Sequence, residues 1–323
     1  MACKKTDYRH VSRTDGLELC VTRTEPDDAS EIIGSAVIVH GMCEHKGRYD
    51  ETVAFLSEHG YVTVIFDLRG HGGSVRTPED LGYLYDAGYN GFIEDLKEIT
   101  DETKAYTAER TGKNVPCVLL AHSMGTLITR CFLRKYDDMV DRVCLFGCPS
   151  KRGGMLPGLL IAKTIALFKG GKGHSRLVDF LVGSAFEKPF RKEGRPFAWT
   201  NSDPEQVRMY LDDPLCGFRF TLNGHINLIG MTMLTYKDGG YAMKNPALPI
   251  RFFSGQDDPC AVSEKKLSDA VRLLKKQGYS DTKGKMYPGM RHEILRERCK
   301  ETLREDVLRF LTGQEGETEW NVM

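Results

Sequence analysis

The sequence predicts an α/β protein built on a mostly parallel, eight-stranded sheet, with helices on both faces and a helical segment inserted between two strands. Three observations lead to this prediction. Short apolar runs alternate with helical patterns along most of the chain. Two alternating runs near the N-terminus meet at Asp15-Gly16, a dipeptide typical of hairpin turns. The interval from Pro149 to Tyr241 is far longer than an ordinary connection and has helical patterns of its own.

The predicted elements follow one another in a regular order. An antiparallel hairpin of residues 8–13 and 17–24 opens the chain. Short apolar runs then predict six parallel strands, because strands buried on both faces are apolar throughout. These strands are expected near residues 35–40, 61–66, 115–121, 142–147, 249–254 and 283–287. Helices are expected between them, near residues 48–59, 89–106, 124–136, 263–277 and 297–312.

The long interval divides the chain into two predicted parts, a core of residues 1–148 and 241–323 and a helical cap of residues 149–240. Residues 149–200 carry ten Lys or Arg against three Asp or Glu, and residues 155–168 are apolar apart from one lysine. An apolar helix with basic flanks can contact a lipid surface, so we expect weak membrane-surface contact through the cap. The alternative is that this helix packs into the core of the cap. Residues 312–323 form an acidic tail that we expect to fray.

Composition limits the class of protein. The 323 residues have a formal net charge of zero, so no overall field favours nucleic acid. No run of 18 apolar residues predicts a membrane span, and the N-terminus has no signal-peptide pattern. Ten scattered cysteines, several within apolar strands, predict reduced thiols and a cytoplasmic protein.

Ser123 is the strongest candidate for a reactive residue. It stands between the predicted strand 115–121 and the predicted helix 124–136, in a turn so tight that the positions two before and two after must be small. Gly125 meets this requirement and Ala121 nearly does. The turn presents the hydroxyl beside the N-terminus of the helix, where backbone N–H groups are free. A serine placed there can attack an acyl carbon, whereas the alternative is an ordinary helix N-cap.

An acid and a base follow Ser123 in the chain order that such a nucleophile requires. Asp257 and Asp258 come directly after the predicted strand 249–254, and His292 follows the strand 283–287. Both loops are therefore expected at the carboxyl edge of the sheet. A neutral imidazole would take the serine proton, and a buried carboxylate would fix its tautomer.

The loop after the strand 35–40 is predicted to hold an oxyanion. Gly41 allows the backbone to approach closely, and the expected donors are the N–H groups of Met42 and Met124. His40, Cys43 and His45 match no standard zinc spacing, so no metal is expected there.

A second Gly-rich loop follows the strand 61–66. We interpret it as structural, held by Asp67 and Arg69. His71 precedes the serine, so it is not expected to be the base.

Together these residues resemble the α/β-hydrolase superfamily and, within it, the group of monoacylglycerol lipases, lysophospholipases and serine aminopeptidase S33-like proteins. The resemblance runs from about residue 7 to 312. It rests on residues 40–49, 67–72, 121–125, 254–259 and 287–293. The Gly-x-x-Asp pattern of the family falls on Gly255 and Asp258, which favours Asp258 over Asp257 as the acid.

The resemblance implies a serine hydrolase that acts through Ser123, His292 and Asp258 without cofactor or metal. The expected substrate is a small ester with a hydrophobic acyl chain, such as a monoacylglycerol or lysophospholipid. Alternatives are a short-chain carboxylesterase, an amide or peptide hydrolase, and a non-catalytic binding module. The oxyanion loop lacks the His-Gly-Gly-Pro-Gly of proline iminopeptidases, which argues against peptidase activity. Side chains that could line an acyl pocket are Phe197, Trp199, Met209, Phe218 and Phe220.

Overall fold

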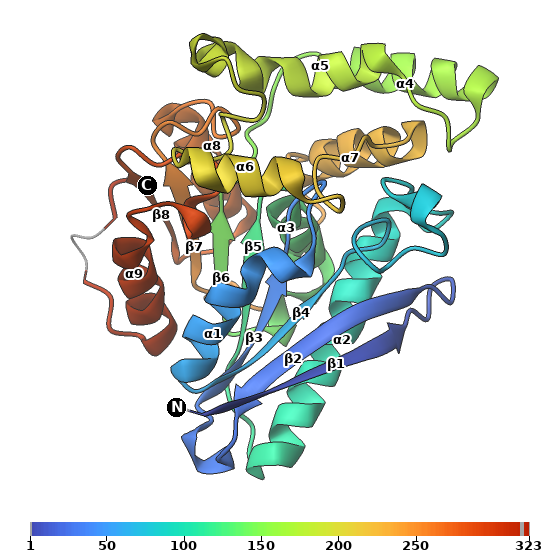
Figure 1. The fold of residues 1–323 in the computed structure, drawn as a ribbon. Coiled ribbons are helices and arrows are strands. Elements are labelled where there is room, and N and C mark those ends of the chain that lie inside the picture. The colour runs from blue at the N-terminus through green and yellow to red at the C-terminus, as the bar shows by residue number, and fades with distance from the viewer. Residues whose placement is uncertain (1, 317–319, 323) are drawn as a thin grey trace.

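The computed structural model describes residues 2–316 and 320–322 and contains one eight-stranded sheet (Figure 1). The spatial order is β1-β2-β4-β3-β5-β6-β7-β8. Strands β1–β2 and β2–β4 pair antiparallel, and the remaining pairs are parallel, which confirms the predicted α/β sheet. The strands are β1 Cys3–Val11, β2 Glu18–Pro26, β3 Gly34–Val39, β4 Tyr61–Phe66, β5 Cys117–His122, β6 Arg142–Phe146, β7 Ile250–Gly255 and β8 Thr282–Tyr287.

The five helices predicted between strands are all present. They are α1 Asp50–Glu58, α2 Gly88–Thr111, α3 Met124–Tyr136, α8 Glu264–Gln277 and α9 Lys300–Thr312. Helix α2 runs further than predicted and ends where Gly112 takes a left-handed conformation with φ 69°. The hairpin strands extend beyond their predicted outer ends and stop short of the predicted ends at the turn, because the register of β1 on β2 runs from Cys3↔Pro26 to Val11↔Glu18.

The helices cover both faces of the sheet because side chains alternate between the faces along each strand. On β3, Val37 and Val39 join the apolar cluster under α2, α3 and α8. Ala36 and Ile38 join the opposite cluster, under α1 and α9. The central strands are therefore buried on both sides, as their unbroken apolar sequences predicted.

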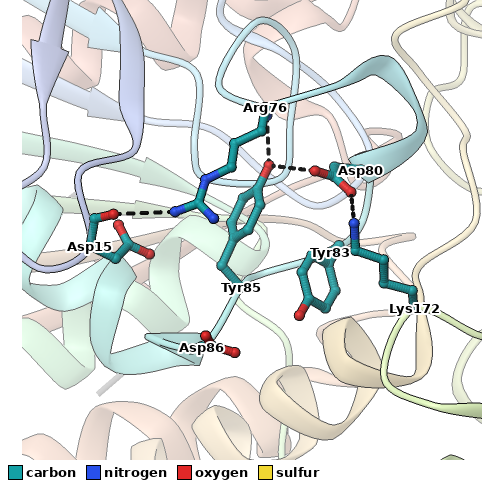
Figure 2. A pocket seen from close by; sticks show the side chains of 7 residues that line it. All are labelled: Asp15, Arg76, Asp80, Tyr83, Tyr85, Asp86 and Lys172. Carbon is teal, nitrogen blue, oxygen red and sulfur yellow. Dashed lines mark hydrogen bonds and ion pairs between the residues drawn. The ribbon is translucent and has the colours of Figure 1, made fainter.

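Four helices lie between β6 and β7, within residues 149–240, here called the inserted segment. They are α4 Met155–Lys169, α5 Arg176–Glu187, α6 Pro204–Asp212 and α7 Leu222–Thr235. Figure 1 shows α4 and α5 as the outer layer above α6 and α7, on the side where the parallel strands end. An ion pair of 2.6 Å joins Lys172 of this segment to the buried carboxylate of Asp80 (Figure 2).

The described residues near the C-terminus pack on the sheet. The prediction of a frayed C-terminus was wrong for the described tail residues, because Trp320 is buried against Phe253 and Val322 pairs with Gly284. The indole and the valine side chain are buried against apolar groups there, which offsets the entropy lost when the tail becomes ordered.

Within the described part of the chain, no helix is long and apolar enough to cross a membrane.

Candidate active site

Ser123 lies in a strained turn between β5 and α3. Its backbone has φ 51° and ψ −118°, which is rare for a residue with a side chain and is held here by its surroundings. A Cβ atom at Gly125 would lie 2.3 Å from the carbonyl oxygen of Val39, so only glycine fits at that position. Ala121 is fully buried in β5. The small residues at these two positions therefore let the helix start directly against β3, as the turn motif requires.

The structure brings Ser123, His292 and Asp258 together. The Nε2 atom of His292 lies 2.8 Å from the Oγ of Ser123, and its Nδ1 lies 3.0 and 3.1 Å from the carboxylate oxygens of Asp258. Asp258 and His292 are buried, whereas Asp257 is exposed and bonds to the site only through its backbone. Of the two neighbouring acids, Asp258 is therefore the one that contacts the imidazole.

The loops that carry Asp258 and His292 meet because they follow adjacent parallel strands. Strands β7 and β8 pair from Ile250↔Thr282 to Gly255↔Tyr287, so loops 256–260 and 288–293 leave the same edge of the sheet. A Cβ at Gly255 would lie 2.2 Å from the carbonyl oxygen of Met290. Glycine at position 255 thus permits the backbone contact that places Asp258 beside His292.

Loop 40–45 follows β3 and lies against the serine. A Cβ added to Gly41 would come within 3.1 Å of the Cβ of Ser123, so this loop packs directly on the turn. In the described part of the chain, no acceptor is found for the backbone N–H groups of Met42 and Met124. These are the two groups that the sequence predicted as oxyanion donors.

A buried carboxylate fixes that loop, and sequence reasoning missed it. Glu44 accepts hydrogen bonds from the Gly41 N–H at 2.6 Å, the Tyr49 hydroxyl at 2.8 Å and Arg48 Nη1 at 2.8 Å. The Nδ1 of His122, the residue before the serine, lies 3.2 Å from the same carboxylate. Glu44 therefore contacts both the loop 40–45 and the turn that carries the serine.

Arg48 extends this cluster to the loop that carries His292. Its guanidinium forms a two-point pair with Glu293, the residue after His292, at 2.7 and 2.8 Å. Burial opposes ionisation of Glu44, but the hydrogen bond from His122 and the charge of Arg48 outweigh it and hold the pKa of Glu44 well below its usual range. The only sequence signal was two opposite charges four residues apart, and this does not reveal the third partner.

The surroundings of His292 shift the pKa of its imidazole. Burial alone would lower its pKa, but the carboxylate of Asp258 and, after it, the side chain of Cys260 outweigh burial and raise the pKa of His292 well above 6.5. Burial raises the pKa of the Cys260 thiol.

Other histidines of the predicted loops have structural contacts. His40 and His71 are fully buried, and burial lowers their pKa values to about 4 and about 3. His40 accepts from the Leu68 N–H, and His71 packs edge-on against Phe218 and Phe220. The interpretation of His71 as structural agrees with these contacts.

Asp67 and Arg69 hold the second Gly-rich loop, as predicted. Asp67 accepts from the backbone N–H groups of Lys46 and Gly73, and Arg69 pairs with Asp15 and Asp95.

Two groups of donor atoms in the described residues are close enough to ligate a metal. Asp258, Cys260 and His292 form one, and His45, Asp213 and Cys216 form the other. In both, the histidine already pairs with the carboxylate, at 3.0 Å and 2.8 Å respectively. These hydrogen bonds account for the proximity of the side chains without an ion.

The predicted pocket residues separate into different environments. Trp199 packs against His292, with ring centroids 5.2 Å apart. Phe197 packs on Tyr210, Phe220 is 1% exposed in the core, and Met209 is 49% exposed. Of the ring contacts formed by these side chains in the described residues, that of Trp199 reaches His292. A polar cavity of about 200 Å³ lies elsewhere (Figure 2), lined by Asp15, Arg76, Asp80, Tyr83, Tyr85, Asp86 and Lys172.

Comparison with known proteins identifies the family. The profile described as "Serine aminopeptidase, S33" matches residues 30–299, which is most of the chain. The chain belongs to the serine aminopeptidase S33 family.

The individual relatives described next have low sequence identity to this chain. This family member is 24% identical over 284 residues to a monoacylglycerol lipase of Mycolicibacterium smegmatis, covering 87% of this chain and 88% of that one. It is 29% identical over 109 residues to a probable lysophospholipase L2 of Haemophilus influenzae, which covers 34% and 33% of the two chains. Among solved structures, a carboxyl esterase from Bacillus coagulans superposes with a TM-score of 0.84 at 23% identity, over 97% and 99% of the two chains. This likeness confirms the predicted α/β-hydrolase fold.

Replacing Glu44 by Gln should destabilise the protein by about 3 kcal/mol, because breaking a buried ion pair leaves the charge of Arg48 incompletely compensated. Urea unfolding measures this loss. The matched control is Glu51→Gln, whose carboxylate is 62% exposed and pairs with Lys300 and Arg304. The control should lose less than about 1 kcal/mol. Equal losses in the two variants would contradict the assigned importance of the buried cluster.

Proposed function

We propose that this protein is a serine hydrolase that cleaves small carboxylic esters with a hydrophobic acyl chain, of the monoacylglycerol or lysophospholipid kind, through an acyl-enzyme. The observation that carries the proposal is the continuous contact from Ser123 Oγ to His292 Nε2 at 2.8 Å and from His292 Nδ1 to Asp258. A nucleophile, a base and an orienting acid in such contact are the requirements for acyl transfer.

In the proposed reaction, His292 takes the proton of Ser123 as the hydroxyl attacks the ester carbonyl. Asp258 holds the imidazole in the tautomer that leaves Nε2 free to accept, and it stabilises the imidazolium that forms. The N–H groups of Met42 and Met124 bind the oxyanion. His292 then returns the proton to the leaving alcohol. In the second half, a water molecule gives a proton to His292 as it attacks the acyl carbon, and His292 passes that proton to the oxygen of Ser123 as the carboxylic acid leaves.

The substrate class is supported by the relatives. A relative that matches over most of both chains is a monoacylglycerol lipase, and a relative that matches over part of its length is a probable lysophospholipase. The family description names an aminopeptidase, so hydrolysis of aminoacyl amides is the second candidate. A panel of p-nitrophenyl esters, monoacylglycerols, lysophospholipids and aminoacyl amides separates the two, since the same residues would serve both reactions.

We further propose that the inserted segment is a cap that contacts lipid surfaces weakly. Helix α4 buries only Ala162 and exposes Leu156, Leu160, Leu167 and Phe168, the last two at 84% and 86%. Exposed apolar groups gathered on one element mark an interaction surface. The segment 149–200 is also basic, which complements an anionic membrane.

The proposed reaction needs no cofactor or metal, because the residues above supply every proton transfer. No nucleic acid partner is proposed, since the formal net charge is zero. A cytoplasmic location is proposed because the ten cysteines are scattered without a framework pattern, several of them within apolar strands.

Ser123→Ala should lower kcat by roughly 10⁴–10⁶-fold and leave the fold intact, because it removes the attacking atom and little volume. Hydrolysis of p-nitrophenyl esters measures the rate, and thermal unfolding checks the fold. A fluorophosphonate probe should label the parent protein and not the variant. Full labelling of Ser123→Ala would rule out Ser123 as the nucleophile.

The acid limb of kcat/KM should have its midpoint above pH 6.5. The base must be neutral, and Asp258 raises the pKa of His292 above that of a free histidine, so activity falls as pH decreases through the raised value. Asp258→Asn should move the midpoint down and lower kcat by about 10⁴-fold, because it removes the negative charge and presents the wrong tautomer.

The matched control for that experiment is Asp257→Asn, which changes an exposed neighbour. It should shift neither the midpoint nor kcat appreciably. A more severe effect of Asp257→Asn than of Asp258→Asn would transfer the role of the acid to Asp257.

Replacing Leu167 and Phe168 together by Ser should weaken binding to phosphatidylcholine–phosphatidylglycerol vesicles, because both side chains would insert in the apolar boundary. Vesicle co-sedimentation at low and high salt measures this, and binding should weaken at high salt because exposed charges are screened. The matched control replaces Val11 and Ile33, which are exposed on the core, and should bind normally. Absence of vesicle binding by the parent protein at low salt would refute the proposed membrane contact and leave the catalytic proposal standing.

A further inference from the structure

The base of the proposed triad touches the inserted segment as well as the core. The indole of Trp199 lies against the imidazole of His292, with centroids 5.2 Å apart and planes inclined at 44°. Trp199 is half-buried, and His292 is buried beneath this contact. Asp258 bonds to one nitrogen of His292, and the indole packs on the ring itself.

Trp199 is held in turn by the end of helix α5. Its Nε1–H donates to the carboxylate of Glu187 at 3.1 Å, and the same oxygen accepts the backbone N–H of Phe197 at 3.0 Å. The ring of Phe186 packs on the indole, with centroids 5.1 Å apart. Phe186 and Glu187 are the last two residues of α5, so the outer layer of helices fixes the position of the indole.

The backbone around Trp199 is also bonded to both neighbours of His292. The N–H of Glu293 donates to the carbonyl of Thr200 at 2.7 Å. Arg291 donates through Nη1 to the carbonyl oxygens of Ala198 and Asn201. The loop that carries the base and the segment that carries the indole therefore form one connected unit.

These contacts bear on the rate because a general base must stay within hydrogen-bond reach of both the nucleophile and the leaving group. Asp258 at Nδ1, the thiol of Cys260 and the ring of His122, with centroids 4.9 Å apart, hold the imidazole from the core, and the indole adds a packed ring from the inserted segment. Misplacement by about 1 Å can lower a rate by about 10²-fold.

We propose that Trp199 is a positioning residue for His292, held in place by Glu187, and that it links the conformation of helix α5 to the activity of the site. This inference rests on the proposed role of His292 as general base. It differs from the expectation that Trp199 lines an acyl pocket, because a pocket wall changes the dependence on acyl length, whereas a positioning residue changes kcat even for an acetyl ester.

The first test compares Trp199→Ala and Trp199→Phe on p-nitrophenyl acetate. Trp199→Ala should lower kcat by about 10–100-fold with little change in KM, and Trp199→Phe should recover most of the loss because a ring again packs on the imidazole. Glu187→Ala should lower kcat in the same direction, and Glu187→Gln, which keeps an acceptor oxygen, should be close to the parent.

The matched control is Trp320→Ala, which removes the only other tryptophan from a buried site on Phe253. It should reduce thermal stability while leaving kcat unchanged. An unchanged kcat in Trp199→Ala, or a loss confined to KM and to long acyl chains, would overturn the proposal. Such a result in an enzyme that Ser123→Ala inactivates would leave the proposed hydrolase function intact.

The second test is spectroscopic and independent of turnover. In a Trp320→Phe background Trp199 is the single tryptophan, and a protonated imidazole in contact quenches indole emission. Emission should rise with pH at the same midpoint as the acid limb of kcat/KM, and His292→Asn should abolish this transition. Asp258, Cys260, His122 and Glu187 are titratable groups that also contact one of the two rings. A change in Trp199 emission with pH that survives His292→Asn would therefore come from one of them and would contradict the proposed contact between Trp199 and His292.

Discussion

The geometry of the site depends on one buried carboxylate, that of Glu44. Three loops must meet at the carboxyl edge of the sheet, and each comes from a different part of the chain. Glu44 bonds to the N–H of Gly41 in the first loop and lies beside His122 in the second. Through Arg48 it reaches Glu293 in the third. A buried charge cluster tolerates little displacement, because any separated partner is left unpaired in a medium of low polarity.

The sequence predicted the frame of the site well because the frame follows from local rules. Apolar runs located the strands, and residues directly after them, Ser123, Asp258 and His292, had to share one edge of the sheet. Glycine spacing favoured Asp258 over Asp257, and the structure shows the reason in the backbone contact at Gly255. These signals lie within a few residues of the groups they position.

What the sequence could not predict depends on contacts between distant residues. Arg48 and Glu293 are 245 positions apart, and no local pattern pairs them. The contact of Trp199 with His292 required the path of the inserted segment, which has no strand to set its register. The tail was misjudged because its acidic composition indicated solvation, whereas Trp320 and Val322 find partners on the sheet.

The inserted segment has exposed apolar residues on α4 and, at the end of α5, contacts that lead to His292. Helix α4 buries little of its own surface, so its apolar residues are available to a partner of low polarity. The end of α5 holds the indole that packs on His292. A surface that binds the outer helices would therefore act close to His292, the proposed base.

The most direct test of the account is to trap the acyl-enzyme. Rapid acid quench during hydrolysis of p-nitrophenyl octanoate, followed by mass spectrometry, measures which residue carries the acyl group. The account predicts one octanoyl group per chain on the peptide that contains Ser123, formed in step with a burst of p-nitrophenol. Turnover with an octanoyl group on another residue would contradict it.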